Sequence, residues 1–101
     1  MNQFEFTEIV AQANGLSRKQ ARRVVRTVLR TLQETVIRGD RVVFSGFGVF
    51  DAVEGKARKG HNPQSNQLIE IEAKRRPRFT PGATFKKAVQ TGELPEDDIQ
   101  E

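Results

Sequence analysis

The residues best suited to chemistry are the basic side chains on either side of a turn, within Lys56–Arg78. This stretch holds seven Lys or Arg and two Glu, and its turn carries Asn62, Pro63, Ser65 and Asn66. Lysine and arginine neutralise phosphates, and a two-stranded ribbon with basic roots can lie along a polyanion. The stretch therefore predicts a hairpin arm that binds a polyanion.

Other kinds of site find little support in the residue types. The chain has no Cys and one His, which excludes disulfides and leaves no credible metal cluster. No His, Cys or carboxylate groups stand at catalytic spacing. We expect that the protein is not an enzyme and that it binds no cofactor or metal. We interpret His61 as a contact at the arm tip.

The charge is strongly divided along the chain. The formal net charge is +4, but residues 1–92 carry 17 basic and 8 acidic side chains, which is +9. A body this basic indicates a nucleic acid or another anionic surface, with a solvated basic surface of no special purpose as the alternative. Residues 92–101 form an acidic tail that we expect to be disordered. It either aids solubility or competes with DNA for the basic body.

Length and hydropathy set further expectations. A chain of 101 residues is one small domain with a modest core, for which dimerisation is a natural remedy. The first ten residues do not resemble a signal peptide, and no apolar run approaches membrane length. We expect a soluble protein of a reducing compartment, the cytoplasm.

Two amphipathic helices are predicted in the first 39 residues. Asn2 and Glu5 have capping-box spacing for a helix over residues 3–14, and Ser17 and Gln20 repeat it for a longer helix that ends at Gly39. In the first helix Phe6, Ile9, Val10 and Ala13 recur at helical spacing. In the second, one face carries Ala21, Val24, Val25, Val28, Leu29, Leu32 and Val36. A short link favours an antiparallel pair.

An arginine stripe accompanies the second helix. Arg22, Arg26 and Arg30 stand four residues apart, with Arg23 beside them. The first interpretation is a solvated helix face, and the alternative is a track that faces DNA.

The remaining chain predicts a sheet and a short helix. Strands are expected over 42–44, 49–53 and 68–73, with a bend or bulge at Gly55 and an edge or break at Pro77. A helix over 83–90 should place Phe85 and Val89 inward and Lys86 and Lys87 outward. The fold class is α+β, with an N-terminal helical hairpin, an antiparallel sheet with a long arm, and a short C-terminal helix.

Four motifs stand together in a distinctive order. They are Gly46-Phe47-Gly48-Val49-Phe50, Ala57-Arg58-Lys59-Gly60, Asn62-Pro63-Gln64 and Phe79-Thr80-Pro81-Gly82. In this order and spacing they closely resemble the HU/IHF family of bacterial histone-like, DNA-bending proteins. The resemblance runs almost without gaps from Met1 to about Val89.

The resemblance implies an intertwined dimer whose helices form the base and whose β-arms reach around a duplex. The domain would cover residues 1–91, with the arm over about 53–77. Pro63 is expected to insert between base pairs in the minor groove and kink the DNA. Locally, Asn-Pro is also a plain turn signal. Proline suits a wedge because its ring is rigid and apolar and its backbone has no N–H to leave unpaired.

Two groups of residues follow from the residue types and the resemblance together. The predicted DNA contacts are Lys56, Arg58, Lys59, His61, Asn62, Pro63, Gln64, Ser65, Lys74, Arg75, Arg76, Arg78 and Lys86. The predicted dimer core is Val28, Leu32, Phe44, Phe47, Phe50, Phe79 and Phe85. No aromatic lies between Phe50 and Phe79, which argues against single-strand binding by base stacking.

Several positions depart from the family pattern. His61, Val53 and Gly55 stand where Arg is frequent, Ala83 where Lys is frequent, and Asn66 where a turn glycine is frequent. We hypothesise that the cluster Lys74, Arg75, Arg76 and Arg78 replaces the missing phosphate contacts at the arm base.

The sequence thus predicts a non-enzymatic, dimeric DNA-bending protein of the bacterial nucleoid or of a phage. It would bind duplex DNA largely without sequence specificity and would bend and compact that DNA. A preference for bent, nicked or distorted DNA would be consistent with this mode of binding. One alternative is a subunit of a sequence-specific, IHF-like heterodimer. A more remote alternative is an RNA-binding or protein-interaction module that uses the arm.

Overall fold

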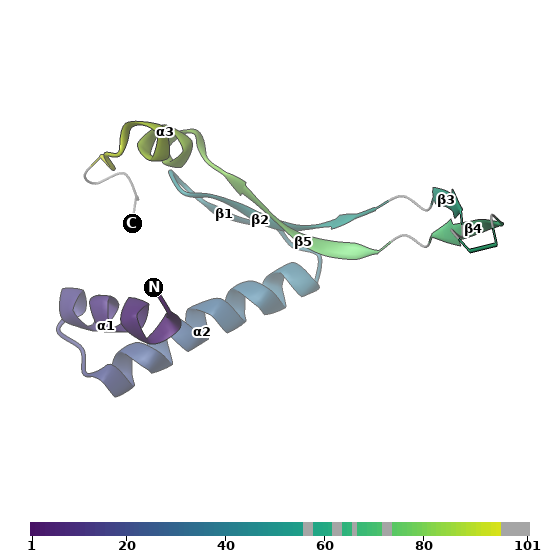
Figure 1. Ribbon diagram of the computed structural model, residues 1–101. Helices are drawn as coiled ribbons and strands as arrows, with labels where there is room; N and C mark the ends of the chain where they lie inside the picture. The colour runs from purple at the N-terminus through teal and green to yellow at the C-terminus, as the bar shows by residue number, and fades with distance from the viewer. Residues whose placement is uncertain (56–57, 62–63, 66, 72–73, 96–101) are drawn as a thin grey trace. The chain divides into compact units, whose positions relative to one another are not determined.

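The computed structural model describes residues 1–55, 58–61, 64–65, 67–71 and 74–95. They divide into two units, Met1–Thr35 and the chain from Val36 onward. The elements, labelled in Figure 1, are α1 Gln3–Asn14, α2 Arg18–Ile37, β1 Val42–Phe44, β2 Gly48–Glu54, β3 Arg58–His61, β4 Leu68–Ile71, β5 Arg75–Pro81 and α3 Ala83–Thr91. The predicted order of elements and the α+β class are confirmed.

The ends of α1 are fixed by its own sequence. The Asn2 side chain accepts a hydrogen bond from the Glu5 amide at 2.9 Å. At the other end Gly15 adopts φ 63°, the left-handed conformation that glycine accommodates without strain. The predicted bounds of this helix are confirmed to the residue.

The start of α2 is a reciprocal capping box. Gln20 donates its backbone N–H to Ser17 Oγ at 3.1 Å, and Ser17 donates its own to Gln20 Oε1 at 2.9 Å. Gly39, at φ 95°, follows the last turn and donates to the Val36 carbonyl at 2.9 Å. Both predicted ends of the long helix are confirmed.

The first unit packs α1 and α2 as an antiparallel pair. Arg18 at the start of α2 contacts Glu8 at 2.9 Å, while Arg22, further along α2, lies 5.7 Å from the ring centre of Phe4, earlier in α1. The contact that lies further toward the C-terminus of α2 lies further toward the N-terminus of α1, so the two helices run in opposite directions. The predicted helical hairpin is confirmed.

The buried residues of α1 are small. Thr7 and Ala11 are its buried residues, whereas Phe6 and Ile9 are 55% and 54% exposed. Ala13 is also exposed, and Val10 is only half-buried. The larger apolar side chains that recur at helical spacing on α1 are therefore mostly uncovered in a single chain.

The apolar face of α2 is likewise only partly covered. Ala21 is fully buried and Val36 is buried, but Val24, Val28 and Leu29 are 46%, 55% and 48% exposed. The predicted stripe exists, and a single chain leaves much of it accessible.

The second unit contains an antiparallel sheet in the order β1-β2-β5. Phe50 lies opposite Phe79, and Asp51 lies opposite Arg78. Pairing continues from Gly48–Pro81 to Glu54–Arg75 without a bulge, and the Gly55 N–H then donates to the Lys74 carbonyl at 3.1 Å. Cross-strand hydrogen bonding therefore reaches Gly55, and the bend or bulge predicted there, where the arm leaves the sheet, borders residues 56–57, which lie outside the described residues.

Pro77 lies within β5 and does not interrupt it. Its Cα partner is Ala52, and β5 is one of the two outer strands of the sheet. A proline cannot donate a hydrogen bond, and an outer strand has one side that needs no partner. The predicted edge is confirmed, and the predicted break is wrong.

The arm and the C-terminal helix complete this unit. β3 and β4 pair antiparallel as a separate two-stranded sheet, with Gly60 opposite Ile69. The described part of the return strand ends at Ile71, short of the predicted residue 73. In α3, Phe85 is half-buried, but Val89 is 71% exposed, so its predicted inward position is wrong within one chain. None of the described helices is long and apolar enough to cross a membrane.

Gly48→Ala tests the tightest point of the sheet. An added Cβ would lie 2.6 Å from the Phe79 ring and 2.6 Å from the Thr80 carbonyl oxygen. We expect a loss of about 1–3 kcal/mol in unfolding free energy, measured by urea denaturation at fixed protein concentration. Gly55→Ala is the matched control, because its Cβ would meet only the Lys74 carbonyl at 3.6 Å. Equal losses in both variants would contradict this account.

Candidate nucleic-acid interface

Strand alternation gives the sheet two chemically different faces. Residues two apart on a strand point the same way, so Phe50 and Phe79 share one face while Asp51 and Arg78 share the other. We call the first the phenylalanine face and the second the polar face.

The phenylalanine face carries a cluster of five rings, Phe44, Phe47, Phe50, Phe79 and Phe85. Ring centres are 4.6 Å apart for Phe50–Phe79 and 5.3 Å for Phe47–Phe79. Phe85 joins from α3, stacked on Phe47 at 5.3 Å. Such tilted and offset pairs stabilise a core beyond their buried area. The structure thus brings together all five phenylalanines of the predicted dimer core.

This cluster is incompletely buried. Phe44, Phe47 and Phe79 remain 42%, 39% and 38% exposed, and none of the large side chains in the described residues is fully buried. Beside the rings lies an open groove lined by Phe79, Pro81, Phe85, Lys86, Val89 and Gln90. The apolar surface of one chain therefore remains available to another.

The polar face is organised by an ion pair. Arg78 donates to both carboxylate oxygens of Asp51, at 3.0 Å and 2.7 Å. Asp51 is largely covered, with 12% of its side chain exposed, whereas 54% of the Arg78 side chain is exposed. These hydrogen bonds lower the pKa of Asp51, against an opposing effect of burial, and the charges of Arg78 and Arg41 lower it further. The same pair raises the pKa of Arg78.

The four bases at the arm base have different surroundings. Arg75 donates to the Ile37 carbonyl through both terminal nitrogens, each at 3.3 Å, and Arg78 is held by Asp51. Lys74 and Arg76 are exposed and, within the described residues, form no salt bridge. Arg76 lies opposite Val53, on the same face as Arg78. Two of the four predicted contacts are thus already engaged within the chain.

The other predicted DNA contacts lie on several elements. Lys59 is exposed in β3, Gln64 and Ser65 are exposed in a turn, and Lys86 is exposed on α3. Arg58 and His61 are the first and last residues of β3. Lys56, Asn62 and Pro63 lie outside the described residues.

Asp51 is a site residue that the sequence prediction missed. It is the one acid within the alternating run Val49–Val53, and it follows Phe50 directly. A carboxylate in a strand that pairs with a basic strand was an available signal, since opposite charges across an antiparallel pair attract. This signal identifies the partner of Asp51 only when the register of the two strands is known, and the sequence alone does not specify that register.

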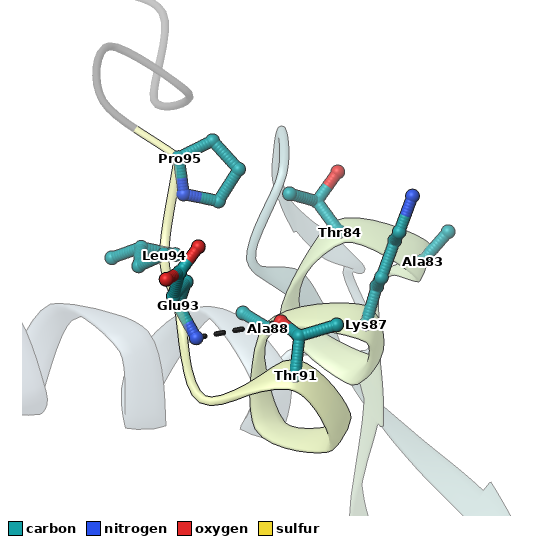
Figure 2. Close-up of a pocket in the computed structure, with 8 residues that line it drawn as sticks. All are labelled: Ala83, Thr84, Lys87, Ala88, Thr91, Glu93, Leu94 and Pro95. Carbon is teal, nitrogen blue, oxygen red and sulfur yellow. Dashed lines mark hydrogen bonds between the residues drawn. The ribbon is translucent and has the colours of Figure 1, made fainter.

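A second hollow lies beside α3 (Figure 2). Gly92 turns the chain at φ 82°, Glu93 donates its N–H to Thr91 Oγ at 3.4 Å, and Leu94 and Pro95 help to line a space with Ala83, Thr84, Lys87 and Ala88. It holds one lysine and one carboxylate and has no catalytic constellation. No group of three metal-binding side chains occurs in the part of the chain that the structure describes.

Comparison with known proteins gives a consistent result. Residues 1–90 match the family model described as bacterial DNA-binding protein. DNA-binding protein HU of Geobacillus stearothermophilus is 42% identical over 90 residues, covering 89% of this chain and all of that protein. The chain belongs to the bacterial DNA-binding (HU/IHF) family. The family and these relatives are DNA-binding proteins rather than enzymes, as the sequence predicted.

Solved structures of the family share the fold. The HU–DNA cocrystal structure from Anabaena superimposes with a TM-score of 0.79 at 42% identity, covering 88% of this chain and 97% of that one. HU from Thermotoga maritima gives a TM-score of 0.61 at 26% identity, covering 88% of this chain and 98% of that one. Integration host factor subunit alpha of Myxococcus xanthus is 41% identical over 101 residues, covering this whole chain and 78% of that protein.

Asp51→Asn should make the stability of the folded protein less dependent on pH in the acid range. Arg78 lowers the pKa of Asp51, so the stabilisation from its charge is present above the unfolded pKa of about 3.9 and disappears as pH falls through the lowered value. We expect wild-type urea midpoints to fall more steeply than those of the variant as pH drops below 4. Glu34→Gln, which removes the exposed Arg30–Glu34 pair, is the control and should retain the wild-type profile. Parallel pH profiles for wild type and Asp51→Asn would refute the role of this pair.

Proposed function

We propose that this chain is a dimeric architectural protein that binds duplex DNA largely without sequence specificity and bends it. The observation that supports this most is the division of one sheet into an apolar face and a polar face that carries Arg76 and Arg78. Its strands lead into a basic arm. The HU relative solved with DNA supports the same partner.

Dimerisation follows from the uncovered apolar surface. Val28 on α2 is 55% exposed, and three rings of the phenylalanine cluster are more than a third exposed. Burying apolar surface contributes about 25 cal/mol per Å², so a second copy that covers these side chains would stabilise both chains. We assign Val28, Leu32 and the phenylalanine cluster to this interface, and residues 1–91 to the DNA-binding domain.

Bending would combine neutralisation with insertion. The basic side chains of the arm and of the polar face release counterions from phosphates. Pro63 would enter a base step, where unstacking costs a few kcal/mol that additional contacts to wrapped DNA offset. A protein of this kind would reside on the nucleoid in the cytoplasm, with the acidic residues 92–101 as an appended tail.

A second candidate is a subunit of an IHF-like, sequence-specific heterodimer. The match to integration host factor subunit alpha of Myxococcus xanthus extends over all 101 residues, whereas the Geobacillus HU match spans 90. The tail is therefore included in the first match only.

Binding and bending measurements on the chain alone distinguish these candidates. Gel-shift affinity and fluorescence-detected bending are measured on intact, nicked and random-sequence duplexes across a salt series, with an RNA duplex for comparison. Sequence-independent binding with preference for nicked DNA supports the HU-like role. Strong preference for one site, or binding only with a second subunit, supports the IHF-like role. Failure to bind DNA at any salt concentration overturns both.

Pro63→Ala should reduce bending more than binding. Alanine lacks the ring that would occupy the opened base step, while the phosphate contacts remain. We expect lower energy-transfer efficiency between end-labelled dyes at saturating protein, with a similar salt dependence. Gln67→Ala, an exposed position close to the same turn that is not among the predicted contacts, is the control. An unchanged bend angle in Pro63→Ala would exclude the wedge.

Arg76→Ala tests whether the polar face contacts phosphates. Each phosphate contact contributes about 0.9 to the slope of log affinity against log salt, so the slope should fall by about this amount for each protomer of the dimer. Arg75→Ala should have a smaller effect, because Arg75 already donates to the Ile37 carbonyl. If replacing both arginines leaves affinity and slope unchanged, the arm base does not contact phosphates.

A further inference from the structure

The hollow beside α3 in Figure 2, which we call the α3 hollow, lies on a side of this helix that the proposed dimer interface does not use. Its lining includes Thr84, Lys87 and Thr91, at the spacing i, i+3 and i+7 of one helix face. Phe85 and Val89 of the same helix line the groove beside the phenylalanine cluster. At 100° per residue the two sets lie about 150° apart around the helix, so a second copy on the phenylalanine face would leave the α3 hollow accessible.

The chain beyond α3 returns along the helix. Gly92 adopts the left-handed conformation at φ 82°, and Leu94 and Pro95 then line the α3 hollow together with Ala83, the first residue of the helix. Figure 2 shows Leu94 and Pro95 beside the helix. A proline also restricts the residue before it to extended conformations, which gives the returning chain a defined direction. Pro95 therefore lies close to the first turn of α3.

The α3 hollow has a largely apolar lining with few charges. Alanine, leucine and proline side chains form much of this lining, and its charged residues are Lys87 and Glu93. Its volume of about 680 Å³ falls within the range of about 300–1,000 Å³ that is typical of ligand pockets. Leu94 lines it and is nevertheless 69% exposed. The hollow can therefore accept a short segment that offers apolar and acidic side chains.

The lysines of α3 lack acidic partners within the described residues. Lys86 and Lys87 are exposed and form no salt bridge there. Glu93 lines the same hollow as Lys87 but does not pair with it. Two adjacent uncompensated cations attract a nearby carboxylate or phosphate.

The six residues that follow Pro95 match this chemistry. Residues 96–101, which we call the acidic segment, carry four acids and no base, and Ile99 is the one apolar residue among them. Fully extended, six residues span at most about 20 Å, while the nine residues of α3 rise about 14 Å. The acidic segment can therefore reach both lysines of the helix from Pro95.

We propose that the acidic segment binds in the α3 hollow of its own chain and lowers the affinity of the protein for DNA. Ile99 lies against the apolar lining. Asp97 and Asp98 pair with Lys87, and their charge also screens Lys86, one of the predicted DNA contacts. DNA phosphates and these carboxylates then compete for the same cations. The inference rests on the proposed function, because only a protein that binds DNA has a DNA affinity to lower.

Amide chemical shifts of the full-length protein without DNA test the binding of the segment. Asp97→Asn with Asp98→Asn removes two charges, and the amide signals of Thr84, Lys87 and Ala88 should move, although these residues are nine or more positions away in the sequence. Added salt should move the wild-type signals in the same direction, because salt screens exposed ion pairs. Unchanged signals in the variant would overturn the proposal.

Glu5→Gln with Asp40→Asn is the matched control. It removes the same charge from two exposed positions that do not line the α3 hollow, and it should leave those signals unchanged. Ile99→Gln tests the apolar contact at constant charge and should move the same three signals. Equal movement in the control would overturn the proposal. Signals that depend on protein concentration would assign the hollow to another molecule and would also overturn it.

Gel-shift affinity for a nicked duplex tests the competition. Asp97→Asn with Asp98→Asn should bind about threefold more tightly than wild type at low salt and by a smaller factor at high salt, because exposed ion pairs are weak and screened. In a Lys87→Gln background the same change should give a smaller gain, since the segment then lacks its partner. An equal gain with Lys87 replaced, or in the control of Glu5 and Asp40, would attribute the effect to net charge and overturn the proposal.

Failure of the proposed function has a different signature from failure of this inference. A chain that binds no DNA in any variant overturns the proposed function and the competition together, while the amide shifts still report whether the segment occupies the hollow. Normal DNA binding with the same affinity in wild type and in Asp97→Asn with Asp98→Asn overturns this inference alone.

Discussion

The antiparallel pairing of β2 with β5 is the constraint on which the sheet's other features depend. It places Phe79 opposite Phe50 and Arg78 opposite Asp51, so one ladder positions both the aromatic cluster and the ion pair. A slip by one residue would exchange the faces and expose the phenylalanines on the polar side. The close approach of Phe79 to Gly48, where no Cβ fits, helps to fix this register.

The same register separates two roles among neighbouring arginines. Arg78 is aligned with a carboxylate and stabilises the fold, whereas Arg76, two residues earlier on the same face, lies opposite Val53 and remains exposed. Arg75 points to the other face and donates to a carbonyl at the end of α2. A basic cluster that is uniform in sequence is therefore divided between structural and exposed positions.

Both units leave apolar side chains exposed to solvent in a single chain. In the helical unit, Thr7, Ala11 and Ala21 are buried, while Phe6 and Ile9 remain accessible. In the second unit the phenylalanine cluster is half-covered. A small domain buries a smaller fraction of its surface than a large one, and a second copy would cover the apolar side chains left exposed here.

Local sequence was sufficient for the three helices and for β1, but β5 was not predicted as a strand. The caps at Asn2, Ser17 and Gly15 depend on side-chain and backbone preferences over three or four residues, so helix bounds were predictable from the chain alone. The family motifs likewise identified the fold, because they occur in a fixed order along the chain. What helical periodicity could not give was which apolar side chains one chain buries, as Phe6, Ile9 and Val89 show. Tertiary structure alone decided the Asp51–Arg78 pair and the position of Arg75, because strand register is a long-range property that no local pattern specifies.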